Sequence, residues 1–119
     1  MKSQTPLSIP GIDTAKGIFL TGGTEEFYRR ILDLFQKSVR ERLPGLQTVP
    51  EADALPVFII EVHTLKSMCA SIGAAILSAE AAALESAGKA GDFAFIKDNL
   101  RGFTERIREM AENIHTALE

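Results

Sequence analysis

The last quarter of the chain carries an apolar pattern that is typical of a long α-helix. After Asp92, apolar residues recur at alternating spacings of four and three residues: Ile96, Leu100, Phe103, Ile107, Met110, Ile114 and Ala117. Side chains at these spacings lie on one face of a helix. Asp92 is suited to cap this helix, because its carboxylate can accept hydrogen bonds from free backbone N–H groups. A helix with one apolar face needs other helices to cover that face.

Three further segments have helical character. The apolar positions of the first two are Tyr28, Ile31, Leu32, Phe35 and Val39, and then Phe58, Val62, Leu65, Cys69 and Ile72. Residues 74–90 hold many alanines, which have high helix propensity. No alternating run of strand type is long enough to compete. We therefore predict an all-α fold, an antiparallel up-down four-helix bundle with a short N-terminal helix that caps one end.

The expected helix ends follow from residues that cap or interrupt helices. Asp13 is a suitable N-cap for the short helix to about residue 20, and Thr24 for the first long helix. We expect Asp53 to cap the next helix, because Pro56 is tolerated only in a first turn. Gly73 marks the end of that helix.

The length of 119 residues fits one domain with a substantial core. Residues 1–11 contain Pro6, Pro10 and Gly11 and are predicted to form an N-terminal tail or linker. Residues 12–119 are then the bundle domain. Hydrophobic residues make up 45% and charged residues 24%, which is the composition of a globular protein and not of a disordered one.

Composition also argues against several partners and compartments. The net charge is −3 and acids alternate with bases along the chain, so nucleic acid and anionic membranes are disfavoured. The apolar run at 55–60 is far shorter than the roughly 18 residues of a membrane span, and the first eleven residues lack the hydrophobic block of a secretory signal. Cys69 is the only cysteine, which excludes an internal disulfide and favours a small core residue. We expect a cytoplasmic, monomeric domain without membrane insertion.

His63 lies on the helix predicted around residues 53–73, but it does not share that helix's apolar face. At about 100° per residue, it points roughly 140° away from that face, toward solvent. Its neighbours on the same side are Ile59, Ile60, Lys66, Ser67 and Ala70.

This exposed side has the chemistry of a phosphoryl carrier. A neutral imidazole nitrogen is a nucleophile near pH 7. Lys66 supplies a cation for phosphoryl oxygens, and Ser67 adds a hydroxyl group. Ile59 and Ile60 add an apolar patch of the kind that marks protein contacts. These local residues alone fit an ordinary solvated helix face equally well.

The segment HTLKSMCASIGA at 63–74, followed by LSAEAAALESAGKAGD at 77–92, resembles the histidine phosphotransfer (HPt) domain of multistep phosphorelays, as in bacterial hybrid sensor histidine kinases. The family pattern H-x-L-K-G, a small residue, glycine, L-E and G-D falls on His63, Leu65, Lys66, Ser67, Cys69, Gly73, Leu84, Glu85, Gly91 and Asp92. The upstream segments PGID at 10–13 and TGGTEEFYRRILDLF at 21–35 are similar to the entry segment and first long helix of such domains. The chain departs from the pattern at Ser67, where glycine is usual, and at Cys69.

The resemblance implies that His63 accepts a phosphoryl group from the aspartyl phosphate of one response-regulator receiver domain and passes it to another. It assigns Lys66 the role of the phosphate-stabilising cation, and the side with Ile59, Ile60, Ser67 and Ala70 would dock the receiver. The domain would be a phosphoryl carrier, either free-standing or as the cytoplasmic end of a membrane-bound hybrid kinase. The sequence has no Gly-rich phosphate loop, so no ATP site is expected, and Mg²⁺ would belong to the receiver and not to a cofactor site of this domain.

Three alternatives remain open from the sequence. A degenerate HPt-like bundle would act only as a scaffold for protein interactions, although the presence of both His63 and Lys66 argues against this. A metal-binding bundle is suggested by the E-x-x-H unit Glu112 to His115, but there is no second such unit. A dimerising kinase domain would have an acidic residue and a proline where Thr64 and Met68 stand.

Overall fold

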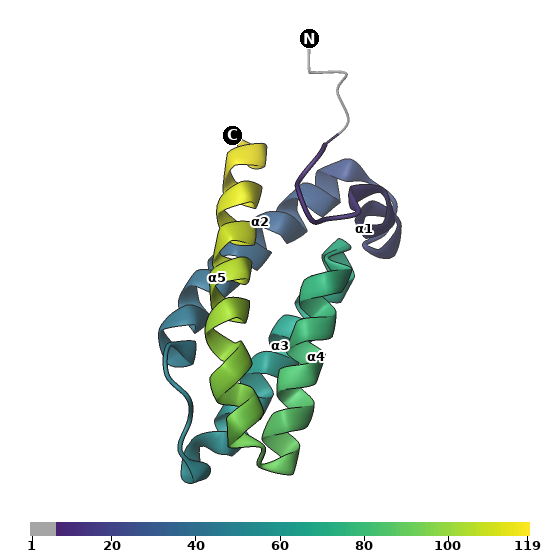
Figure 1. Ribbon diagram of the computed structural model, residues 1–119. Helices are drawn as coiled ribbons and strands as arrows, with labels where there is room; N and C mark the ends of the chain where they lie inside the picture. Colours follow the sequence, from purple (N-terminus) through teal and green to yellow (C-terminus); the bar gives the residue numbers. More distant parts are fainter. Residues whose placement is uncertain (1–6) are drawn as a thin grey trace.

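The computed structural model describes residues 7–119, and all regular elements in this range are helical (Figure 1). The α-helices are α1 (Thr14–Leu20), α2 (Glu25–Arg42), α3 (Leu55–Ile72), α4 (Ala75–Ala90) and α5 (Phe93–Leu118). Two short 3-10 helices, η1 (Leu43–Leu46) and η2 (Ala52–Ala54), lie between α2 and α3. The predicted all-α fold is confirmed.

Three of the four predicted N-caps are confirmed. The backbone N–H groups of Lys16, Phe27 and Phe95 donate to the side chains of Asp13, Thr24 and Asp92 over 3.0, 3.2 and 3.1 Å. The prediction for Asp53 is wrong, because this residue lies inside η2 and Ala54 stands at the N-cap of α3 without a side-chain hydrogen bond. The 3-10 turn leads directly into α3, so backbone groups take the place of a capping side chain.

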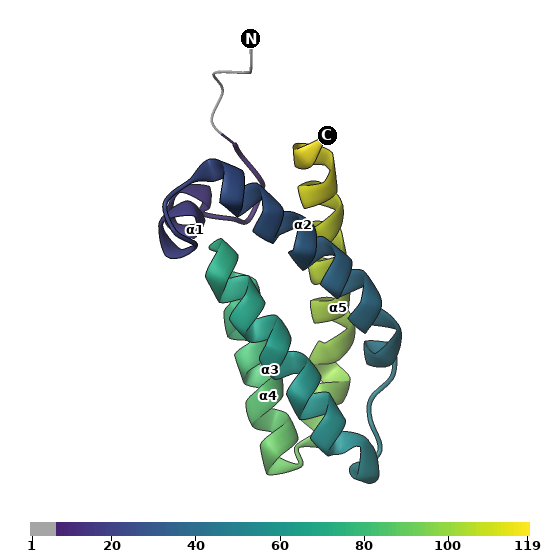
Figure 2. The ribbon, with the colours of Figure 1, turned by 180° about the vertical axis from the view of Figure 1, so that it is seen from behind.

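One hydrophobic core joins the helices. Helices α3 and α4 pack along each other, and α5 packs against both α2 and α4 (Figures 1 and 2). The predicted apolar face of α3 is buried in full: Phe58, Val62, Leu65, Cys69 and Ile72. On α5 the residues from Ile96 to Ile114 in the predicted pattern are buried, and Ala117 is partly buried.

The segment around α1 closes the end of the molecule where α3 stops, as both ribbon views show (Figures 1 and 2). The Tyr28 hydroxyl donates to the Ile72 carbonyl over 2.7 Å, and the Asp13 N–H donates to the Gly73 carbonyl over 3.0 Å. Gly73 ends α3 with a φ of 91°, a left-handed conformation that favours glycine. Gly17 lies so close to Ile72 and Tyr28 that a Cβ atom would collide with both.

The predicted tail, residues 1–11, is described only from residue 7 onward. Leu7 and Ile9 are buried and belong to the hydrophobic core. Residues 1–6 lie outside the described part of the chain, and the boundary at residue 11 stays a prediction.

Helix α3 has two apolar surfaces. By length and composition alone, the stretch from Ala52 to Ile72 could span a membrane, and 28% of the relevant window is buried. One of its faces lies in the core, whereas the side chains of Val57 and Ile60 are 61% and 62% exposed. The stretch also carries the polar residues Glu61, His63 and Lys66.

Candidate functional site

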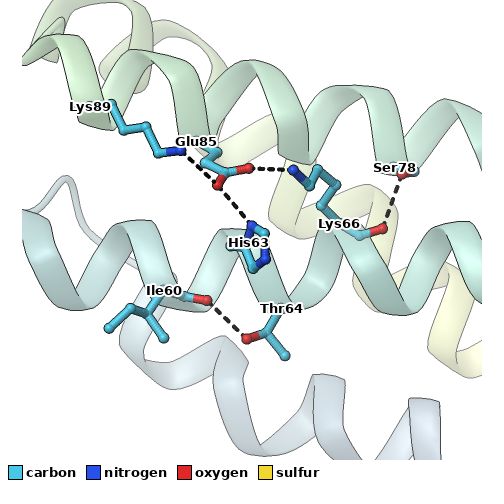
Figure 3. A network of polar contacts seen from close by, with 7 residues as sticks. All are labelled: Ile60, His63, Thr64, Lys66, Ser78, Glu85 and Lys89. Carbon is cyan, nitrogen blue, oxygen red and sulfur yellow. Dashed lines mark hydrogen bonds and ion pairs between the residues drawn. The ribbon is translucent and has the colours of Figure 1, made fainter.

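His63 lies near the middle of α3, on the side that faces α4, and its side chain is 55% exposed. Its Nδ1 atom is 2.8 Å from Oε2 of Glu85 on α4 (Figure 3). The Glu85 side chain is only 7% exposed, so it approaches the imidazole from the protein interior. The second ring nitrogen points away from Glu85 in this view. The predicted exposure of His63 agrees with this placement.

Glu85 joins His63 to two lysines. Its Oε1 atom is 2.8 Å from Nζ of Lys66, and its Oε2 atom is 3.3 Å from Nζ of Lys89 (Figure 3). The hydrogen bond from Lys66, together with those from His63 and Lys89, lowers the Glu85 pKa to about 2, against the opposing effect of burial. Glu85 is therefore a carboxylate at neutral pH.

The charge of Glu85 fixes the imidazole tautomer. An ionised carboxylate has no hydrogen to donate, so Nδ1 of His63 must carry the hydrogen of the 2.8 Å bond. In a neutral ring the other nitrogen, Nε2, then keeps its lone pair. Nε2 is thus the nucleophilic nitrogen, whereas Nδ1 is hydrogen-bonded to the buried Glu85.

Local helix geometry explains why these side chains meet. His63 and Lys66 are three residues apart on α3, and Glu85 and Lys89 are four apart on α4, so each pair lies on one helix face. Gly88 allows the two helices to approach closely, because a Cβ atom there would be 2.8 Å from Cγ1 of Ile59. At this separation the Glu85 side chain spans the gap to the imidazole.

The residues predicted to dock a partner do not all have the same exposure. Ile60, Ser67 and Ala70 are exposed on the surface of α3, whereas Ile59 is only partly exposed and packs beside Gly88. The Thr64 hydroxyl donates to the Ile60 carbonyl over 2.9 Å. Within residues 7–119 the Ser67 hydroxyl has no such partner. The docking role of these residues stays a prediction.

Glu85 and Lys89 are site residues that the sequence analysis did not assign. Glu85 belongs to the L-E pair of the family pattern, which was the available signal. Its burial, which accounts for its charged partners, is visible only in the structure.

Two other polar groups are explained by local ion pairs. Glu61 pairs with Arg42 of α2, and both side chains are 30% exposed, so this contact joins α2 to α3. Glu112 is 3.5 Å from Arg108, and residues 7–119 contain no group of three or more His, Cys, Asp or Glu side chains arranged for a metal ion. The E-x-x-H unit thus has no further ligands within this range.

Comparison with known proteins gives one match. A family model described as the Hpt domain matches residues 30–117, a range that contains His63, Lys66, Glu85 and Lys89. No curated protein and no solved structure matches the chain. Helix α1 lies outside the matched range.

Proposed function

The chain belongs to the Hpt domain family, and we propose that it is a phosphoryl carrier in which His63 accepts a phosphoryl group from one receiver domain and passes it to another. Hpt domains are phosphocarriers that work with response-regulator receiver domains. The observation that supports His63 as the acceptor is its bond from Nδ1 to the buried Glu85 carboxylate, which leaves Nε2 exposed as the nucleophile.

The proposed step forms one bond and breaks one bond. Nε2 of His63 attacks the phosphorus of the receiver's aspartyl phosphate, and a P–N bond forms. The P–O bond to the aspartate breaks, and its electron pair stays on the aspartate carboxylate. The ring keeps its hydrogen at Nδ1, so it becomes positively charged while it carries the phosphoryl group. Glu85 lies beside this new charge and stabilises it.

Lys66 is proposed to attract the phosphoryl oxygens. Its Nζ atom already lies in the same network, 2.8 Å from Glu85, and its side chain is 32% exposed. A cation that is partly shielded from water interacts more strongly with a phosphoryl group than a fully hydrated one. Its flexible stem lets the ammonium group move between the carboxylate and an incoming phosphoryl group.

The receiver is proposed to dock on the exposed side of α3. Ile60 gives this side an apolar contact, and the small side chains of Ser67 and Ala70 leave room beside the imidazole. We also propose that the receiver supplies Mg²⁺ and that the domain is a monomeric, cytoplasmic module without an ATP site. The four long helices are proposed to follow the antiparallel up-down order expected from the sequence.

The test is incubation with a receiver that carries a labelled phosphoryl group. The wild type should acquire an acid-labile, alkali-stable label, and His63→Gln should acquire none. Phosphorus and nitrogen NMR of the labelled protein should place the phosphoryl group on Nε2. Equal labelling of His63→Gln would refute the proposal. Receiver binding without labelling of the wild type would instead indicate an interaction scaffold.

A further inference from the structure

Helix α3 carries three hydroxyl side chains, and they differ in their hydrogen bonds. The hydroxyl of Thr64 donates to the Ile60 carbonyl over 2.9 Å, and that of Ser71 donates to the Ser67 carbonyl over 3.0 Å. Each of these two groups thus bonds to the carbonyl four residues earlier, a common arrangement for such side chains in helices. The Ser67 side chain is exposed, and its hydroxyl makes no hydrogen bond within residues 7–119. Ser67 therefore keeps a donor that can bind a ligand at the surface.

Ser67 lies on the side of His63 that faces away from α4. At about 100° per residue, the direction of Ser67 differs from that of His63 by about 40°, and that of Lys66 differs by about 60° in the opposite sense. Lys66 is on the α4 side, where its Nζ atom is 2.8 Å from Glu85. The Nδ1 atom of the imidazole also faces Glu85, so the Nε2 atom faces away from α4 (Figure 3). A phosphoryl group on Nε2 would then lie on the side of Ser67.

The two side chains are also close along the helix. Ser67 follows His63 by four residues, a spacing that places the two Cβ atoms about 5–6 Å apart. The phosphoryl oxygens extend beyond Nε2, and the small serine side chain leaves space for them. We propose that the Ser67 hydroxyl donates a hydrogen bond to a phosphoryl oxygen of phosphorylated His63, so that Ser67 is a phosphoryl-binding residue of the site. This inference rests on the proposed function.

The proposed hydrogen bond can form without breaking another contact within the described part of the domain. The Ser67 hydroxyl exchanges a water molecule for a phosphoryl oxygen, and a hydrogen bond to an ionised acceptor is stronger than one between neutral groups. Lys66 approaches the phosphoryl group from the α4 side and Ser67 from the other side. The two donors would therefore contact different oxygens and hold the group in one orientation on the imidazole.

The experiment measures how the phosphoryl group distributes at equilibrium between this domain and the receiver of the labelling test. In the forward transfer the P–O bond to the receiver's aspartate breaks as the P–Nε2 bond forms, and the reverse transfer restores the first bond, so the ratio is approached from both sides. The proteins are kept dilute, so that most molecules are not in a complex. Contacts with a docked receiver then change the rate of transfer but not this ratio, whereas the proposed hydrogen bond exists only in the phosphorylated domain and changes the ratio.

Ser67→Ala should lower the equilibrium constant for phosphorylation of the domain by about three- to tenfold, which is the effect of one net hydrogen bond. Ser67→Gly also lacks the donor and should show the same loss. Ser67 is exposed and alanine has the highest helix propensity, so the alanine variant should fold, and circular dichroism checks this. Ser71→Ala is the matched control, because it removes a hydroxyl one turn further along α3 that is already bonded to a backbone carbonyl. Its equilibrium constant should equal that of the wild type.

The outcomes separate this inference from the proposed function. If Ser67→Ala has the equilibrium constant of the wild type, the inference is overturned and the phosphoryl carrier stays intact; a changed transfer rate would then assign Ser67 to receiver docking alone. Equal losses in Ser67→Ala and Ser71→Ala overturn it as well, because the effect would not depend on the free hydroxyl. A wild type that is never labelled on His63 overturns both the inference and the proposed function.

Discussion

At the scale of single residues, one carboxylate connects the reactive nitrogen to the cations around it. The two oxygens of Glu85 have different partners, since Oε1 contacts Lys66 and Oε2 contacts both His63 and Lys89. A lysine held in this way loses less conformational entropy when it turns to a phosphoryl group, because its side chain is already partly ordered. The two lysines differ in exposure, 32% for Lys66 and 64% for Lys89, and this difference predicts unequal roles.

Lys66→Gln should slow transfer from a phosphorylated receiver by about tenfold. This effect is smaller than the rate loss caused by removing a hydrogen-bond donor from an enclosed oxyanion site, because Lys66 is partly exposed. Lys89→Gln should change the same rate by less than about threefold, because a more exposed charge is more strongly screened. Single-turnover kinetics at equal receiver concentration measure both rates, and circular dichroism checks that the variants are folded. Equal effects of the two substitutions would show that Lys66 has no special role.

Ile60→Ala should weaken receiver binding by about three- to tenfold, because it removes exposed apolar area from the proposed docking side without opening the core. Ile76→Ala is the matched control. Ile76 is 72% exposed, but it lies nine residues before Glu85, about 14 Å along α4. Isothermal titration with the receiver should find the control unchanged. If both variants lose the same affinity, the docking side has been placed wrongly.

The sequence was informative about which residues share a helix face and uninformative about which faces meet. The exposure of His63 follows from its angle to the apolar face of its own helix. Its hydrogen bond to Glu85 joins residues on two helices. Whether it forms depends on the distance between these helices and on their register along the helix axis. Gly88 permits the close approach of the two helices, and nothing in the local pattern indicates which residue of α3 lies opposite it.

At the scale of elements, the end of α3 is held by groups from the N-terminal segment. Two hydrogen bonds, from Tyr28 to Ile72 and from Asp13 to Gly73, satisfy carbonyl groups that a helix end leaves without partners. Gly17 permits α1 to lie directly against this end. This support stabilises α3, and it lies more than two helix turns from His63.

Tyr28→Phe should lower the free energy of unfolding by about 1–2 kcal/mol, because it leaves the buried Ile72 carbonyl without its hydrogen-bond donor. Phosphoryl transfer by the folded variant should stay at the wild-type rate, since Ile72 is nine residues from His63, about 14 Å along α3. Urea unfolding followed by circular dichroism measures the first quantity, and single-turnover kinetics the second. A large loss of transfer in the folded variant would show that the end of α3 influences the site.

The helix ends show where local sequence is sufficient. Asp13, Thr24 and Asp92 cap helices that begin after an extended or turn residue, so a single side chain decides the start. Asp53 failed as a predicted cap because the chain enters α3 through a 3-10 turn with helical backbone angles at Ala54. A capping motif requires a non-helical residue at that position, and the tertiary path of the α2–α3 connection determines whether one is present.

At the scale of the whole molecule, α3 contributes to both the hydrophobic core and the candidate site. The helix contributes a continuous buried face to one core, while its opposite side carries exposed apolar and reactive residues. Glu85 belongs to both environments, because its side chain is buried between the helices and its carboxylate ends at the surface site. The stability of the bundle is thereby linked to the ionisation of a site residue.

This link predicts a pH-dependent difference in stability between wild type and Glu85→Gln. The pKa of Glu85 falls from 4.5 to about 2 on folding, so its carboxylate favours the folded state above the unfolded pKa, and this contribution is lost as pH falls through the folded value. Urea unfolding at steps from pH 5 to pH 2 measures the free energy of both proteins. The advantage of the wild type should be present at pH 5, shrink steadily below about pH 4.5 and be nearly absent at pH 2. Other carboxylates titrate in both proteins and cancel in the difference, so an advantage that stays constant to pH 2 would mean that Glu85 gains nothing from Lys66, His63 and Lys89 on folding.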